Sequence, residues 1–300
     1  MTGFSATDAA LEGFRITREK PKALLAWTAF SFLVSVVGVL ITVNMPAEAR
    51  AALEALQSNQ NPDIENLMEA LAILSPMLLF GLAVQCVMAA AVYRIILRPA
   101  DEKFSYLRLG KDELRLMALT LIYLVLGVML LAAVQLAIVI ITFAASPLGQ
   151  GAMMFVGSAA ELFTLGVFFY VGVRMSLAPV ITFDRGRLAI LDSWTVTHGQ
   201  FWRLLGAYVL AICCVFVVAI LVLMLFYLIS LIVMLSMGGT FGDLRQIFQP
   251  DETTLRSYLN PFMIAYMVVG SLFTAIYYAV IAAPGALAYR ELTGAAPAAA

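Results

Sequence analysis

The sequence predicts an all-α integral membrane protein with six transmembrane helices, built as three pseudo-repeated hairpins with amphipathic helices at the membrane interface. Hydrophobic residues make up 63% of the chain and charged residues only 12%, whereas a soluble domain carries about 25% charged residues. A bilayer core about 30 Å thick is crossed by roughly 20 apolar residues in a helix. Six stretches meet this requirement, and they lie near residues 23–43, 72–97, 114–144, 154–181, 204–237 and 261–289.

The segments before and after the first span have their own helical patterns. Residues 1–22 form a partly amphipathic arm, which we expect to lie on the membrane surface until the chain turns inward at Pro21. An acidic connector covers residues 44–71, and within it Ala47–Leu56 is typical of a short helix. Asn61-Pro62-Asp63 has the residue types of a second helix start. We expect that helix to continue directly into the second span.

The later connectors differ in character. Residues 98–113 mix apolar and charged side chains at the spacing of a surface helix. Residues 145–153 are uncharged and contain Gly and Pro, which predicts a tight turn. Residues 238–260 hold two short helical patterns. The last ten residues, 291–300, form an Ala- and Pro-rich tail that we expect to be disordered.

The basic residues are sorted to alternate connectors. All but three of the 18 Lys and Arg residues lie in the N-terminal arm, around the second and fourth connectors, or at the end of the last span. The exceptions are Arg50, Arg245 and Arg256. By the positive-inside rule this distribution places both termini in the cytoplasm. We therefore predict a protein of the bacterial cytoplasmic (inner) membrane with both ends inside.

An internal repeat accounts for the alternation. Ala9–Leu25 and Ala189–Leu205 share an acid, a small residue, an aromatic residue, a threonine and a closing Leu-Leu, in register and without a gap. Two returning helices end in an arginine followed five residues later by proline, at Arg94 and Arg174. Chance similarity among apolar helices is the alternative. The shared polar positions favour three copies of one unit, in which an amphipathic segment leads into a helical hairpin.

The most specific pattern of the chain lies between Leu177 and Leu205. It begins with Leu177-Ala-Pro, continues through Leu191-Asp-Ser-Trp to a glycine, and ends in an aromatic and leucine-rich helix start. This pattern resembles the signature of the membrane domain of glycerophosphoryl diester phosphodiesterases and of related stand-alone six-helix bacterial proteins of unknown function. The resemblance implies the six-helix plan. It does not imply hydrolase activity, because that activity belongs to a separate soluble barrel with paired histidines, and this chain has one His.

No residue set predicts catalysis or metal binding. The three cysteines lie inside apolar spans, where we expect small buried side chains. Asp192, Ser193 and His198 include the residue types of a hydrolytic triad, but on a helix Ser193 and His198 point about 140° apart. We therefore expect no catalytic, cofactor-binding or metal-binding residues.

The same segment fits an interfacial helix better. Leu188, Leu191 and Trp194 share one arc of the helix, and Trp202 continues an aromatic belt at headgroup level. His198 is then an interfacial polar residue, with a pH-sensitive contact as the alternative. The opposite arc of the helix is polar and comprises Asp192, Ser193 and Thr197.

One acidic residue lies within a predicted span. Glu161 at the centre of a membrane helix costs at least ~2.5 kcal/mol, so it should face a partner or water. Gln135 and Glu161 lie at equal offsets from the turn near Leu148, which predicts a hydrogen bond between them and a protonated carboxyl. A structural polar contact is one interpretation. A proton or substrate site, with Gln85 as a third member, is the other.

Arg94, Arg174 and Arg290 end the three returning helices. They are candidates for contacts with anionic headgroups, each worth about 1 kcal/mol. Side chains that snorkel to the interface as simple anchors are the alternative.

These observations favour a non-enzymatic membrane protein that organises or binds lipids or partner membrane proteins. A small transporter with an acidic site at Glu161 is the alternative, since internal repeats with an intramembrane acid are common in transporters. A membrane-embedded enzyme is a weaker alternative function. Membrane lipids and other membrane proteins are the expected partners, with no nucleic acid and no cofactor, and the sequence does not indicate an oligomeric state.

Overall fold

The computed structural model describes residues 4–58, 64–249, 251 and 254–294, and within these ranges the protein is helical and contains no strand. Six of the described helices are long and apolar enough to cross a membrane, so this is an all-α membrane protein with several spans. The six spans are α2 (Pro21–Val43), α4 (Ile64–Leu97), α5 (Lys111–Ala144), α6 (Gln150–Met175), α9 (Phe201–Ser236) and α12 (Pro261–Thr293). The shorter helices are α1 (Ala6–Glu19), α3 (Ala47–Ser58), η1 (Lys103–Tyr106), η2 (Ser146–Leu148), α7 (Ala178–Arg185), α8 (Asp192–Val196), α10 (Phe241–Ile247) and α11 (Leu255–Tyr258).

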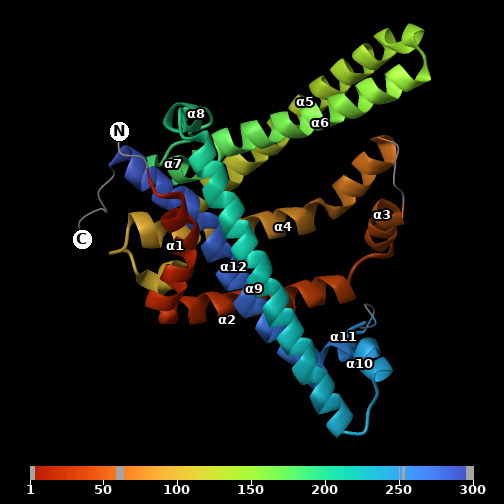
Figure 1. Ribbon diagram of the computed structural model, residues 1–300. Helices are drawn as coiled ribbons and strands as arrows, with labels where there is room; N and C mark the ends of the chain where they lie inside the picture. Colours follow the sequence, from red (N-terminus) through yellow and green to blue (C-terminus); the bar gives the residue numbers. More distant parts are fainter. Residues whose placement is uncertain (1–3, 59–63, 250, 252–253, 295–300) are drawn as a thin grey trace.

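The spans spread apart from one end of the molecule (Figure 1). That end carries α1, the end of α12, α7, α8 and the connector 98–110, and it is termed the basic side below. With 34 residues in α5 and 36 in α9, these helices are about 51 and 54 Å long. A bilayer core is about 30 Å thick. Helices of this length must tilt or extend beyond the hydrocarbon, and their divergence fits the need to tilt.

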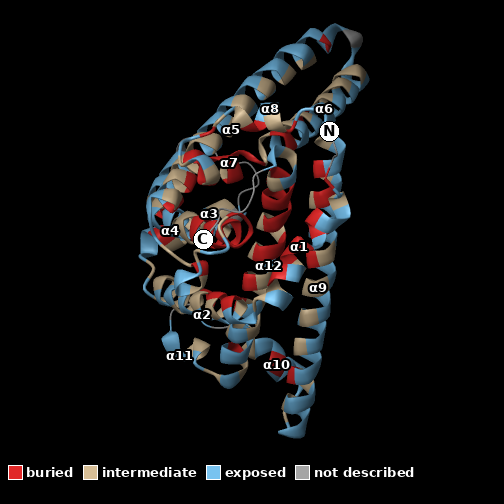
Figure 2. Cartoon of the chain, turned by 90° about the vertical axis from the view of Figure 1, so that its left-hand side faces the viewer, coloured by how far each residue is buried: buried red, intermediate tan, exposed pale blue. Residues whose placement is uncertain are grey.

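Helix α12 is the centre of the basic side and packs against α1, α2, α4 and α9. Figure 2 shows that burial concentrates along α12 and the helices around it. Ala275, Ala279 and Ala283 are fully buried, as expected of a small-residue seam that lets helices approach closely. The closest approach is by Gly13 of α1, where a Cβ would lie 2.3 Å from the Cα of Val280.

The N-terminal arm is more deeply packed than predicted. Helix α1 contacts both α12 and α9, and its buried residues are Ala9, Ala10, Glu12, Gly13 and Ile16. The position of the arm at the membrane surface stays a prediction, and the structure adds that one face of α1 packs against the spans. Small residues at its contact face, which a hydropathy pattern does not rank highly, allow this close crossing of α12.

The spans follow one another as three consecutive pairs, and two of these pairs, α5–α6 and α9–α12, pack together. α5 and α6 contact each other directly through the turn at η2. α2 and α4 each pack against α12 instead. An apolar space of about 760 Å³ remains between α2 and α4 beside α3. α9 and α12 contact each other, and α10 and α11 connect their far ends.

Three boundaries differ from the predictions. The fourth span ends at Met175 rather than 181, and a separate α7 begins at Ala178 with Pro179 in its first turn, because proline cannot continue the hydrogen-bonded helix. Residues 98–110 form a loop around η1 instead of a surface helix. α12 continues to Thr293, so the tail begins later than 291.

Other short elements match the predictions. The predicted helix at Ala47–Leu56 is α3, and α10 and α11 are the two short helices expected within 238–260. Asn61-Pro62-Asp63 and the tail residues 295–300 lie outside the described residues.

Candidate functional site

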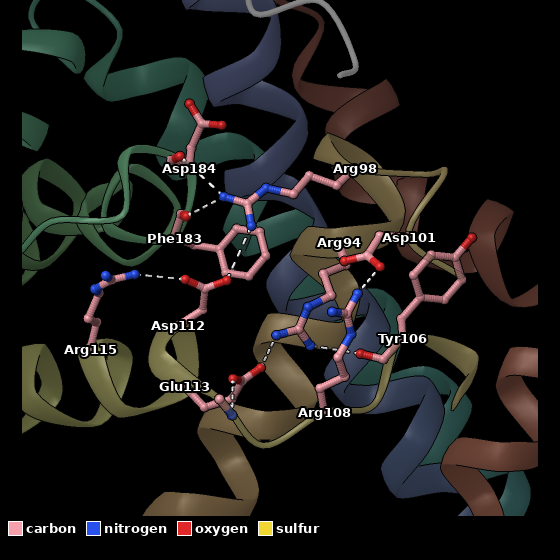
Figure 3. A network of polar contacts seen from close by, with 11 residues as sticks. Arg94, Arg98, Asp101, Tyr106, Arg108, Asp112, Glu113, Arg115, Phe183 and Asp184 are labelled. Carbon is pink, nitrogen blue, oxygen red and sulfur yellow. Dashed lines mark hydrogen bonds and ion pairs between the residues drawn. The ribbon is translucent and has the colours of Figure 1, made fainter. Parts of the chain in front are cut away.

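A network of charged side chains joins α4, the 98–110 connector, α5 and α7 on the basic side (Figure 3). The Arg94 guanidinium pairs with Glu113 and donates to the carbonyl oxygen of Tyr106 at 2.8 Å. The other carboxylate oxygen of Glu113 accepts the N–H of Gly110 at 2.9 Å. The two charged side chains are only 4% and 3% exposed. They form a buried ion pair in which each side chain also bonds to the backbone, as burial of charge requires.

Arg98 extends the network to α7. Its guanidinium lies 3.2 Å from Asp112 and donates to the carbonyl oxygens of Phe183 and Asp184 at 2.9 and 3.2 Å. It also lies over the Phe183 ring, 4.6 Å from the centroid. Tyr289 of α12 donates to the Asp184 carboxylate at 2.8 Å. One set of polar contacts thus fixes the basic-side ends of four helices relative to one another.

The network also holds an unusual turn of the backbone. Phe104, Ser105 and Tyr106 have φ values of 51°, 55° and 69°, a left-handed conformation that costs each non-glycine residue roughly 1–2 kcal/mol. Trp27 of α2 donates to the Ser105 carbonyl at 2.9 Å, and Arg94 donates to the Tyr106 carbonyl. These two buried donors from α2 and α4 stabilise the strained turn.

The three arginines predicted to contact headgroups have other environments. Arg94 is 3% exposed within its ion pair, and Arg174 is 4% exposed with its guanidinium 4.5 Å from the Trp194 ring centroid. The headgroup prediction is wrong for these two, because the ends of α4 and α6 are covered by the connectors that follow them. Arg290 is half-buried and donates to the Ile96 carbonyl at 3.4 Å. A headgroup contact at Arg290 stays a prediction.

Helix α8 turns its polar residues inward. The Ser193 hydroxyl donates to the Arg174 carbonyl at 2.7 Å and accepts the N–H of Leu177 at 3.2 Å. Thr197 donates to the same carbonyl at 3.1 Å, and both side chains are fully buried. These two residues of the polar arc therefore face the protein rather than the surface. They satisfy backbone groups left free where α6 ends.

The residues predicted for the interfacial helix are on the surface. Leu191 is 69% exposed and Trp202 78%, and Leu188, Trp194 and His198 are also exposed. An exposed row of leucine and tryptophan is costly in water and favourable at a headgroup boundary. The interfacial position of this row therefore remains the better prediction.

A groove and a cavity meet beside this row. The groove, of about 460 Å³, lies between α6 and α9 and is lined mostly by apolar side chains, including Leu165, Phe168 and Gly172. The cavity, of about 240 Å³, lies between α4, α9 and α12. Ser176 and Tyr208 line both spaces, so the groove and the cavity adjoin at these two side chains. Hydroxyl and amide groups line the cavity, and its polar residues are Gln85, Tyr93, Ser176, Tyr208, Tyr277 and Tyr278.

The polar residues within the spans do not form the predicted site. Glu161 and Gln135 are both exposed, and no hydrogen bond joins these two described residues. The predicted contact within one hairpin is wrong, because equal depth on two helices does not ensure that the side chains face each other. Gln85 belongs to the tyrosine-lined cavity instead.

Several residues of the charged network and of the cavity were missed from the sequence. Asp112 and Glu113 resemble ordinary acids in the first turn of a helix, and Ser176 and Tyr208 resemble single polar residues near span ends. The available signal was the number of basic residues near them, since arginines at a buried helix end require acidic partners.

No family model matches this chain, and the comparisons find neither a curated protein nor a solved structure that is similar to it. The resemblance to the membrane domain of the phosphodiesterases stays a prediction.

Proposed function

We propose that this protein is a non-enzymatic, multi-pass protein of the bacterial inner membrane, with cytoplasmic termini, that binds and organises lipid. One observation carries the proposal: the apolar groove between α6 and α9 adjoins a polar cavity, with Ser176 and Tyr208 lining both. A space that is apolar at one end and hydrogen-bonding at the other suits an amphipathic molecule.

The dimensions of the groove suit one leaflet. From Leu165 to Ser176 the α6 helix rises about 16 Å, close to half of the roughly 30 Å bilayer core. The Ser176 end lies on the basic side, which also holds α8 and the start of α9 with the exposed Trp194 and Trp202. An acyl chain of the basic-side leaflet can therefore run along the groove without leaving its normal depth.

The lining also favours a chemical class of lipid. The side chains of the cavity offer hydroxyl and amide groups, which donate and accept hydrogen bonds without carrying charge. Ester carbonyls or hydroxyls of a lipid match these groups, whereas an anionic phosphate would need a cation. We propose that the uncharged glycerol-ester or hydroxyl region of the lipid occupies the cavity.

The non-enzymatic part of the proposal rests on how the polar groups are used. The hydroxyl of Ser193 is buried and bonded to backbone at both its donor and acceptor positions. His198 lies on the exposed surface. Of the residue types of a hydrolytic triad, Ser193 therefore bonds to the backbone and His198 lies on the surface, so the two do not form a catalytic pair.

A pair of glycine substitutions on α6 tests the groove. Gly172 lines it, whereas Gly166 does not, and a Cβ at either position would meet no atom within 4 Å. We expect Gly172→Phe to fill the groove and reduce the lipid that remains bound after purification in mild detergent at least tenfold. The measurement is native mass spectrometry of the intact protein.

Gly166→Phe is the matched control, because it adds the same side chain to another face of the same helix. We expect it to retain the lipid bound by the unaltered protein. Equal lipid retention in both variants would contradict a lipid site in this groove. Tyr208→Phe tests the polar end and should weaken binding by about 0.5–1.5 kcal/mol, the usual contribution of one neutral hydrogen bond.

A further inference from the structure

The outer part of the α5–α6 hairpin is uncovered. All of α5 is described, and its buried residues are Glu113, Leu116 and Leu119, all within its first nine residues. Beyond them the hairpin projects away from α9 and α12 (Figure 1). Apolar exposure alone is normal for helices that face lipid. The polar residues on this hairpin are therefore the ones that indicate whether another protein covers it.

Gln135 and Glu161 lie at nearly the same depth. Gln135 precedes the end of α5 at Ala144 by nine residues, and Glu161 follows the start of α6 at Gln150 by eleven. At 1.5 Å per residue these offsets are about 14 and 16 Å. Both side chains therefore lie at about the same distance from the turn, well inside helices that cross the membrane.

The two side chains also lie on the same face of the hairpin. Val134 and Ala160 are half-buried where the helices pack, and each is followed directly by one of the two polar residues. One residue further along a helix rotates the side chain by about 100°. In antiparallel helices this step turns both side chains toward the same face of the pair. Gln135 and Glu161 therefore form a polar patch on one face.

This patch has apolar surroundings. Val128, Leu131 and Val139 lie one or two turns from Gln135 on α5 and are 59%, 44% and 63% exposed. Leu165, one turn from Glu161 on α6, is 55% exposed. Hydrocarbon offers no hydrogen bond to a carboxyl or an amide, and such residues in membrane helices almost always face protein or water.

We propose that a second copy of this chain covers the patch. A two-fold axis along the membrane normal keeps every residue at its own depth and places α5 of one copy against α6 of the other. Glu161 of each copy then meets Gln135 of its partner, so that two reciprocal hydrogen bonds form. The amide of Gln135 can donate or accept, so it pairs with the carboxyl in either protonation state.

A second copy is the favoured occupant because the chain itself carries both complementary groups at matched depth. The four helices at this interface would pack as an antiparallel bundle, the usual arrangement for apolar helices of this length. This interface goes beyond lipid binding and does not require it.

Disulfide formation between differently tagged chains tests the interface in native membranes. In a chain lacking its three cysteines, Val139→Cys in one copy and Gly157→Cys in the other would oppose each other, one turn from the polar pairs. We expect oxidation to link these two copies. Ala137→Cys and Ala159→Cys lie at matched depth on the opposite face of the hairpin, and we expect no link between them.

Equal cross-linking of both pairs, or of neither pair, would overturn the proposal. A second measurement separates the polar contact from simple proximity. In reconstituted vesicles we expect Glu161→Leu to raise the dimer dissociation constant at least fivefold, because two reciprocal hydrogen bonds are lost. Glu161→Gln keeps a neutral hydrogen-bonding group and should stay within about threefold of the unaltered chain.

The two proposals fail separately. Glu161 and Gln135 are not among the residues that line the groove or the cavity, so Glu161→Leu should keep its bound lipid. A chain that dimerises but binds no lipid would contradict only the proposed function, and a monomer that binds lipid would contradict only this inference.

Discussion

At the scale of single residues, the buried ion pair of Arg94 and Glu113 holds the connector between α4 and α5 in place. Transferring two charges out of water is costly, and their attraction offsets this cost only when every remaining polar atom is used. Here Arg94 also reaches the Tyr106 carbonyl, and Glu113 also holds the Gly110 N–H. The pair thus specifies how the connector after α4 returns to α5.

Glu113→Leu should be strongly destabilising, because it leaves Arg94 buried without a counter-ion. We expect a loss of about 3–5 kcal/mol in the free energy of unfolding. The measurement is thermal or denaturant unfolding in detergent micelles. Arg115→Ala is the control, since its pair with Asp112 is partly exposed, and it should cost under about 1 kcal/mol.

A double substitution separates the ion pair from loss of packing. With Arg94→Leu added to Glu113→Leu, the uncompensated charge is gone, and we expect part of the lost stability to return. A double variant as unstable as the sum of the two single variants would show that the charges act independently.

At the scale of whole elements, α1 approaches α12 closely at Gly13. At Gly13 the nearest atoms of α12 belong to the backbone of Ala279 and Val280, so a small rotation of a side chain cannot make room. Glycine at this position serves close approach rather than an unusual φ. α1 is therefore fixed on the central helix by the absence of a side chain.

Gly13→Ala should separate α1 from α12. Its Cβ would lie 2.3 Å from the Val280 Cα, and overpacking of this kind costs about 3 kcal/mol or more when backbone must move. Unfolding in micelles, or faster proteolysis of the N-terminal segment, measures the effect. Gly38→Ala in α2 is the matched control. Its Cβ meets no atom within 4 Å, and it should be neutral or add about 0.5–1 kcal/mol.

Helix α8 depends on its neighbour α6 for its position. Its five residues are too few to form a stable helix alone. Ser193 and Thr197 attach it to the end of α6, which leaves Leu191 and Trp194 on the outside. The attachment makes a row of apolar side chains available to the membrane.

At the scale of the whole molecule, the connectors rich in arginine and both termini share one side. Arg98 contacts α7, and Arg290 contacts the end of α4, so segments far apart in sequence meet there. The far ends hold α3, η2, α10 and α11. Which side of the membrane each set occupies follows from the positive-inside rule and is open to direct test.

Labelling of single cysteines should report this orientation. In a chain without its own cysteines, we expect a membrane-impermeant maleimide to label Ser146→Cys and Thr240→Cys on intact cells. Lys103→Cys and Glu291→Cys should react only after the cells are opened. The reverse pattern would reverse the topology, and mixed labelling within either set would contradict six spans.

Much of the fold followed from local properties of the sequence. The spans at α2, α9 and α12 begin and end within a few residues of their predicted limits. They could be predicted because each span needs only its own hydrophobicity to enter a membrane. The fourth span ended early because Pro179 and the hydroxyl of Ser193 act on the backbone there, and Ser193 is distant in sequence.

The candidate site was less predictable. Glu161 and Gln135 were correctly matched in depth but not in the direction of their side chains, which depends on how α5 rotates against α6. The groove and cavity needed the relative placement of α4, α6, α9 and α12. The three arginines were recognised as a set, yet their burial depends on connectors that fold back over the helix ends.

The sequence by itself determined that this chain lies in lipid, where its spans are, and which connectors carry the positive charge. Tertiary structure alone decided that α12 is central, that Arg94 is buried, and that α6 and α9 leave a groove. The physical reason is that lipid tails and neighbouring helices are equally apolar, so the identity of an apolar side chain does not indicate which of the two it faces. Contacts such as Arg290 with Ile96 join residues 194 positions apart, and no local pattern encodes them.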